Sequence, residues 1–126
     1  MSVLTQPSTM GDVLKYELNP NYIRETVTLL AGHAYPVGAV LGRITASDKY
    51  KFATSGGTDG AQTAAAVLLY AVDATLADAV GIVVARGPAI VSRAALTYDG
   101  SVDDAAKITT KLGQLAELGI IPRETA

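Results

Sequence analysis

The stretch between residues 54 and 91 constrains the fold of this chain most, because it alternates a glycine-rich turn with short apolar runs. The turn at 55–60, SGGTDG, combines three glycines with an Asp whose short side chain can bond to nearby backbone. Apolar runs follow at 64–72 and 79–85, and Arg86-Gly87-Pro88 ends the second. Short runs rich in β-branched residues and bounded by turns are typical of buried strands. We expect them to form the centre of a small β core.

Further strand-like segments lie on both sides of this centre. Strands are expected at about 26–30, at 39–44, at 50–53 and at 96–98, and a loop is expected at 31–38. Gly42 is expected to mark a bulge or a close approach of two backbones. Because clusters of Gly, Pro, Asp and Ser separate these segments, we predict a mainly β domain, either a small barrel or a sandwich.

One segment near the C-terminal end has helical periodicity, and it predicts an amphipathic helix at about 102–118. Ser101 is placed to act as N-cap, and Asp104 three residues later completes a capping box. Gly119 is placed as the C′ residue, and Pro122 prevents the helix from resuming. The face expected to dock on the β core consists of Ala105, Ile108, Leu112, Leu115 and Ala116.

Composition excludes several classes of function. The chain has no cysteine, so disulfides and thiolate metal sites are excluded. Ten basic and twelve acidic residues give a net charge of −2, and they are scattered singly, so no basic stripe could bind nucleic acid. The longest apolar run, at 64–72, is far shorter than the roughly 20 residues that span a bilayer. We expect a protein that is made in the cytoplasm and has no nucleic-acid or membrane partner.

Three ionisable side chains are candidates for a catalytic role. Asp73 and Asp78 flank a turn and could face each other as the paired carboxylates of a small hydrolase, although acids facing water at strand ends is the preferred interpretation. His33 lies in a glycine-bounded loop without a Ser or Cys nucleophile motif nearby. The turn at 55–60 lacks the Lys-Ser/Thr of a phosphate-binding loop and the oxygen spacing of a calcium loop. We therefore expect no catalytic, cofactor-binding or metal-binding residue.

The same turn and the one that ends the second apolar run are interpreted as purely structural. The structural turn residues are Gly57, Asp59, Gly60, Gly87 and Pro88. A cellular β-barrel module that binds a peptide or a glycan is a further alternative. It lacks the exposed aromatic platform that such sites commonly use, because the seven aromatic residues are dispersed along the sequence.

Six short motifs follow one another between about Tyr22 and Arg123. They are Val40-Leu41-Gly42, the GTDGAQ of 57–62, Val67-Leu68-Leu69, Asp73-Ala74, the VVARGPA of 83–89 and Leu118-Gly119-Ile120. In this order the set resembles the bacteriophage head decoration proteins, the family that includes the capsid-stabilising protein of lambda.

The resemblance implies a homotrimer with no catalytic residue and no cofactor. Such trimers lie on the outer surface of the expanded capsid in the virion, at threefold and quasi-threefold positions. They bridge neighbouring major capsid proteins, and they help the shell to resist the pressure of packaged DNA.

The N-terminal part of the chain is expected to attach the protein to the capsid. Residues 1–11 lack apolar periodicity, so we divide the chain into a flexible arm at 1–21 and a β-rich decoration domain at 22–126. The segment at 13–18 has β-forming residues but no obvious partner in its own domain, so it is predicted to add as a strand to the capsid. Alternation would turn Leu14, Tyr16 and Leu18 toward the capsid. The predicted capsid-binding residues are Val13, Leu14, Lys15, Tyr16, Glu17 and Leu18.

Overall fold

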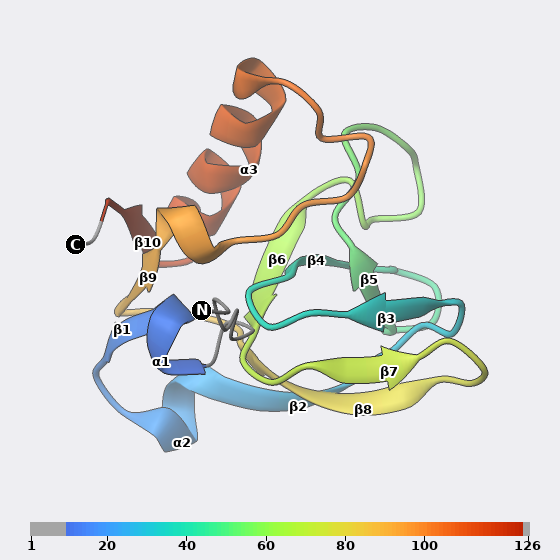
Figure 1. Ribbon diagram of the computed structural model, residues 1–126, viewed down its shortest axis with the longest axis horizontal. Coiled ribbons are helices and arrows are strands. Elements are labelled where there is room, and N and C mark those ends of the chain that lie inside the picture. The colour runs from blue at the N-terminus through green and yellow to red at the C-terminus, as the bar shows by residue number, and fades with distance from the viewer. Residues whose placement is uncertain (1–9, 125–126) are drawn as a thin grey trace, which may run out of the picture.

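Three sheets and one long helix make up residues 10–124, the part of the chain that this computed structural model describes (Figure 1). The strands are β1 (Leu14–Glu17), β2 (Arg24–Leu29), β3 (His33–Tyr35), β4 (Val40–Arg43), β5 (Tyr50–Phe52), β6 (Ala64–Leu68), β7 (Val72–Ala74), β8 (Ala79–Val84), β9 (Ala89–Ser92) and β10 (Ile120–Arg123). The helices are α1 (Met10–Val13), α2 (Pro20–Ile23), the short 3-10 helix η1 (Arg93–Ala95) and α3 (Ala105–Glu117). The predicted mainly β fold with one C-terminal helix is confirmed. None of the helices in this range is long and apolar enough to cross a membrane.

The largest sheet is a closed barrel whose strands follow the order β2-β5-β4-β6-β8. β2 pairs with β8 over its whole length, antiparallel, from Arg24↔Val84 to Leu29↔Ala79. On its other side β2 meets β5 at one pair only, Leu29↔Tyr50, which is parallel. The barrel therefore closes through a single pair of residues at this seam. Beside the barrel, β3 and β7 form a two-stranded antiparallel sheet.

Both faces of the barrel strands β4 and β6 are largely buried, as is the C-terminal end of β8. On these strands Leu41 and Val83 belong to an apolar cluster shared with β3 and β7. Their neighbours Val40 and Val84 belong to a second cluster shared with β9, α3 and β10. Strands that are covered on both faces read as continuous apolar runs, and this is why the sequence shows little alternation there.

β9 is the central strand of a three-stranded sheet that packs beside the barrel. β1 pairs with it antiparallel on one side, and β10 pairs with it parallel on the other. α3 packs against β10 and β6, where Leu115 is fully buried (Figure 1). Gly119 follows the helix with a φ of 83°, so the predicted C′ glycine is confirmed.

The start of the helix differs from the prediction. α3 begins at Ala105 rather than Val102, and its N-cap is Asp104, whose carboxylate accepts a hydrogen bond from the Lys107 backbone N–H at 2.8 Å. Ser101 is not the N-cap, because its hydroxyl accepts from the Ser55 N–H and donates to Asp99. Asp caps a helix as well as Ser does, so sequence alone does not decide between Ser101 and Asp104, which are three residues apart.

The buried face of α3 also differs from the prediction at its ends. Ala105 and Ala116 are exposed, whereas Lys111 is 2% exposed. The buried residues of the helix are Lys111 and Leu115, which are four residues apart and so lie on the same side. A charged residue at a helical core position is rare, and no pattern of apolar residues could have predicted it.

Three strand predictions are also wrong. The run at 64–72 divides into β6 and β7, because the chain bends at Leu69-Tyr70 and leaves the barrel to pair with β3. The expected loop at 31–38 contains β3. The expected strand at 96–98 is a single bridge between Thr97 and Ala39.

The prediction that the segment at 13–18 has no partner in its own domain is wrong as well. β1 pairs with β9 from Leu14↔Val91 to Glu17↔Ala89, and the Leu18 N–H donates to the Pro88 carbonyl at 3.2 Å. Val13 is fully buried in the cluster shared with β9. Residues 10–21 are thus tied to the body of the protein, and the remainder of the predicted arm, residues 1–9, lies outside the described residues.

Candidate functional site

The predicted capsid-binding segment presents only part of itself to solvent. Tyr16 is 47% exposed and Leu18 is 64% exposed, while Lys15 is exposed and its ammonium donates to the Gly11 carbonyl. Leu14 packs partly against the core. The pairing register with β9 shifts between Leu14 and Tyr16, so the strict alternation predicted for this strand is broken there.

Glu17 fastens this segment to the barrel. Its carboxylate accepts hydrogen bonds from Arg24 at 2.5 and 3.0 Å, and its side chain is only 13% exposed. The hydrogen bond to Glu17 raises the pKa of Arg24, partly offset by burial. A two-point Arg–carboxylate pair of this kind fixes geometry as well as charge. Val13 and Glu17 therefore face the protein itself, and Lys15, Tyr16 and Leu18 are the members of the segment available to a partner.

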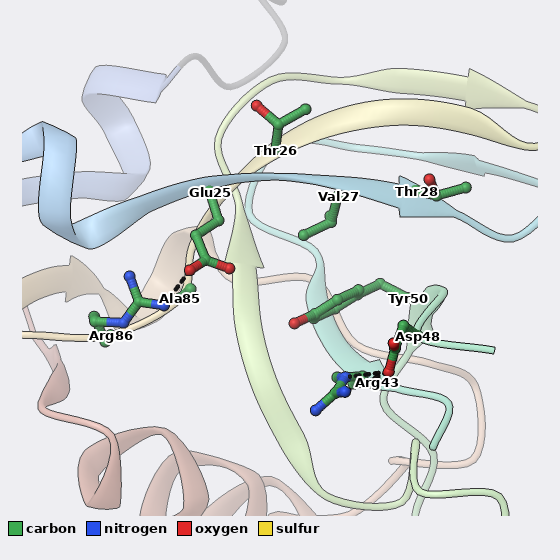
Figure 2. Close-up of a pocket in the computed structure, with 9 residues that line it drawn as sticks. All are labelled: Glu25, Thr26, Val27, Thr28, Arg43, Asp48, Tyr50, Ala85 and Arg86. Carbon is green, nitrogen blue, oxygen red and sulfur yellow. Dashed lines mark hydrogen bonds and ion pairs between the residues drawn. The ribbon is translucent and has the colours of Figure 1, made fainter. Parts of the chain in front are cut away.

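A second feature is a groove of about 500 Å³ beside β2, shown in Figure 2. Val27 and Tyr50 lie between two ion pairs on its walls, Arg86 with Glu25 and Arg43 with Asp48. The hydrogen bond from each guanidinium raises its pKa, so both pairs stay charged. The Arg86 guanidinium also lies 5.2 Å from the centre of the Tyr22 ring. The groove thus has charged walls whose charges cancel in pairs.

The two aspartates considered for acid–base chemistry are each engaged elsewhere. Asp73 accepts hydrogen bonds from the hydroxyl and the N–H of Thr75, and these lower its pKa. Asp78 forms an ion pair with Lys49 at 2.6 Å and accepts from the Ala31 N–H, which also lowers its pKa. A general acid needs a raised pKa, and neither carboxyl group has one. The hydrogen bonds and the ion pair of these two aspartates stabilise the turn that they flank, and they give no support to a hydrolase.

The aromatic residues are less dispersed than the sequence indicates. His33, Tyr35 and Phe52 form a ring cluster with centroid separations of 5.1 to 6.0 Å. Tyr35 is buried and donates a hydrogen bond to the Leu30 carbonyl, so this cluster offers no broad exposed aromatic platform. Within residues 10–124 no group of three metal-ligating side chains comes together.

The glycine-rich turn is organised by backbone geometry and one ion pair. Gly57 and Gly60 have φ values of 140° and 104°. Asp59 pairs with Lys51 at 2.7 Å and accepts from the Ala61 N–H, and these contacts lower its pKa. At the other turn, a Cβ on Gly87 would overlap the Gly119 backbone, and Pro88 is exposed. The positive φ values of Gly57 and Gly60 and the close approach of Gly87 to Gly119 account for glycine at these positions.

Sequence reasoning missed the buried ammonium group of Lys111. It donates to the Gln62 carbonyl and lies 3.4 Å from Gln114 Oε1, and burial lowers its pKa. Gln114 also accepts from the Ala64 N–H, so this small polar network joins α3 to the start of β6. The only sequence signal was a lysine four residues before the core leucine at 115.

Comparison with known proteins places most of the chain in one family of bacteriophage proteins. The family model of the bacteriophage lambda head decoration protein D matches residues 3–120. A search of the curated proteins gives no match. The matched range extends from the N-terminal segment to the start of β10, which includes the barrel, β1 and α3. This chain is therefore a member of the bacteriophage lambda head decoration protein D family.

Proposed function

We propose that this protein is a homotrimer that binds the outside of the expanded phage capsid at threefold and quasi-threefold positions. There it stabilises the shell against the pressure of packaged DNA. Membership of the head decoration family supports association with the capsid and a structural role. The observation that carries the proposal further is the distribution of exposed large apolar side chains, all but one of which, Leu118, fall into two groups along the described chain.

The first group supports capsid contact through the N-terminal segment. Tyr16, Leu18 and Tyr22 are exposed on and just after β1, and Lys15 lies between them and α1. β1 is an edge strand, so its outer side is open to an added strand from a capsid subunit. The Glu17–Arg24 pair holds these side chains in place before docking, which lowers the entropy lost on binding.

The second group supports contact between copies of the chain. Val80 and Ile82 are 65% and 38% exposed on the outer face of β8, Tyr70 is 45% exposed, and Leu76 is 98% exposed on the turn before β8. A small domain that leaves such a stripe uncovered gains stability when a partner copy covers it. A face of this kind contacting a different face of the next copy closes a ring of three.

The test separates the two groups with paired variants. Wild-type protein is added to expanded capsids that lack decoration protein, and occupancy, particle heat resistance and the mass of the free protein are measured. Tyr16→Ser with Leu18→Ser is expected to lower occupancy and leave the free trimer intact. Val80→Ser with Ile82→Ser is expected to shift the free protein toward monomer.

Each pair of variants is the control for the other. Because all four side chains are exposed, neither double variant should unfold the chain. A wild-type protein that leaves capsids bare would refute the proposed function. A wild-type protein that stays monomeric both in solution and on the particle would refute the trimer.

A further inference from the structure

The seam where the barrel closes has an open strand edge. β2 is paired with β8 at every residue from Arg24 to Leu29, but β5 reaches it only at Leu29. The chain leading into β5 turns away at Ser47–Lys49, where Asp48 has a φ of 60°. Residues 25–28 of β2 line one side of the groove in Figure 2, and on that side no strand pairs with residues 24–28. We call this stretch the open edge of β2.

The register identifies which main-chain groups point into the open edge. The Ala85 N–H donates to the Ile23 carbonyl, so odd-numbered residues of β2 direct their N–H and C=O groups toward β8. Even-numbered residues face the opposite way, as the bond from the Leu30 N–H to the Tyr50 carbonyl shows. Within the described chain, no hydrogen bond is formed by the N–H or C=O of Thr26 or by the N–H of Thr28.

The open edge thus presents a row of alternating acceptor and donor. The carbonyl of Arg24, the N–H and carbonyl of Thr26 and the N–H of Thr28 follow one another along the strand. Extended main chain carries the matching series of groups at the same spacing, which single side chains do not. The chemistry of the edge specifies a polypeptide in strand conformation.

The walls of the groove indicate which segment would fit. Glu25 and Val27 point from β2 toward Arg86 and Tyr50, whereas the Thr26 side chain lies on the opposite side of the strand (Figure 2). The charged residues are already paired with each other, so a charged side chain would displace an existing ion pair. An uncharged segment with an apolar side chain directed between Val27 and Tyr50 avoids that cost.

We propose that the open edge of β2 receives an extended, uncharged segment of a capsid subunit as an additional strand. This inference rests on the proposed function, and it adds a second docking site beside the one at β1. A capsid subunit is favoured over the β2 edge of a second copy of this chain, because pairing of two β2 edges is a twofold contact. The proposed trimer is closed by threefold contacts, in which one edge does not pair with itself.

Amide hydrogen exchange measured by mass spectrometry tests the inference without any substitution. The amides of Thr26 and Thr28 are expected to exchange rapidly in the free protein and to be protected on the capsid. The amides of Glu25 and Val27 bond to β8, so they should be slow in both states and serve as the internal reference. Protection that is already present in the free oligomer would assign the edge to a second copy and overturn the proposal.

A pair of variants at one position tests the same edge. Thr26→Pro removes an N–H that has no strand partner and places the proline ring in the path of an added strand. We expect capsid affinity to fall about tenfold or more, with unchanged oligomer mass, while Thr26→Val should bind as the wild type does. Normal binding by a folded Thr26→Pro variant, or unprotected Thr26 and Thr28 amides on decorated capsids, would overturn the inference. Either result would leave the proposed function standing, whereas bare capsids with wild-type protein would remove both.

Discussion

Replacement of Gly42 by Ala tests how tightly the barrel is closed. Gly42 lies in β4, paired with Lys51 of β5 and with Ala64 of β6. A Cβ at this position would lie 2.6 Å from the Ala61 Cα and 2.7 Å from its carbonyl carbon, and the carbonyl oxygen would be nearer still. Ordinary carbon contacts are about 3.5–4.0 Å, so the two backbones would have to separate by about 1 Å.

This separation sets the size of the effect. Overpacking in a well-packed interior costs about 1–3 kcal/mol. Because the new Cβ would meet the backbone of Ala61, which cannot move aside as a side chain can, Gly42→Ala is expected at the upper end of this range. Replacing glycine by alanine also lowers the conformational entropy of the unfolded state, which offsets about 0.4–1 kcal/mol of this loss in stability. We expect a net loss of about 2 kcal/mol, which lowers the melting temperature by about 8 °C for a domain of this size.

The assay is thermal unfolding followed by circular dichroism at one fixed protein concentration, because association would raise the apparent stability. Gly113→Ala is the matched control, since it makes the same chemical change in α3, where a Cβ meets no atom within 4 Å. There the helix propensity of alanine should stabilise the protein by about 1 kcal/mol. A Gly42→Ala variant that melts within about 1 °C of the wild type, while Gly113→Ala raises the melting temperature, would refute the close approach.

Three further outcomes are expected. Gly60→Ala should destabilise the protein more than Gly57→Ala in urea unfolding, because both have positive φ but only at Gly60 does a Cβ also meet backbone, the Arg43 carbonyl at 2.7 Å. Burial raises the pKa of Tyr35 to about 12, so its contribution is complete below pH 10 and roughly 2–3 kcal/mol is lost as the pH rises through 12. Tyr35→Phe should flatten that decline in pH-dependent unfolding, and an unchanged slope would contradict it. Burial lowers the pKa of Lys111, so the unfolded chain binds this proton more readily, and the stability that depends on this group rises with pH up to 10.5. Lys111→Met should remove that rise when unfolding is measured as a function of pH, and a rise that persists would contradict the prediction.

Local chemistry decided the parts of the fold that the sequence predicts well. The β-branched run at 79–85 became β8, the helix ends at the predicted Gly119, and Gly42 does mark both a register shift and a close backbone approach. In each case the signal lies within a few residues of the structure that it specifies. β-Branched residues favour strands, and a residue without a Cβ is required where two backbones meet.

Tertiary partners decided the parts that the sequence did not predict. β1 reads as an unpaired arm because its partner, β9, is more than 70 residues further along the chain, and no local pattern announces that pairing. The division of the run at 64–72 depends on β3, and the burial of Lys111 depends on acceptors from the far side of the glycine-rich turn. The open edge of β2 is likewise a property of where β5 turns away, so the sequence of β2 alone gives no sign of it.

The three-stranded sheet has a mechanical consequence. Leu14, at the start of β1, lies opposite Val91, and Pro122 of β10 lies beside the same residue. The N-terminal end of β1 and the C-terminal end of β10 are therefore at the same end of β9. A pull along the strand axis on either of these strands must slide it past β9 and break its hydrogen bonds together. A sideways pull would peel them away pair by pair. An attachment made through either strand therefore resists tension best when the load runs along β9.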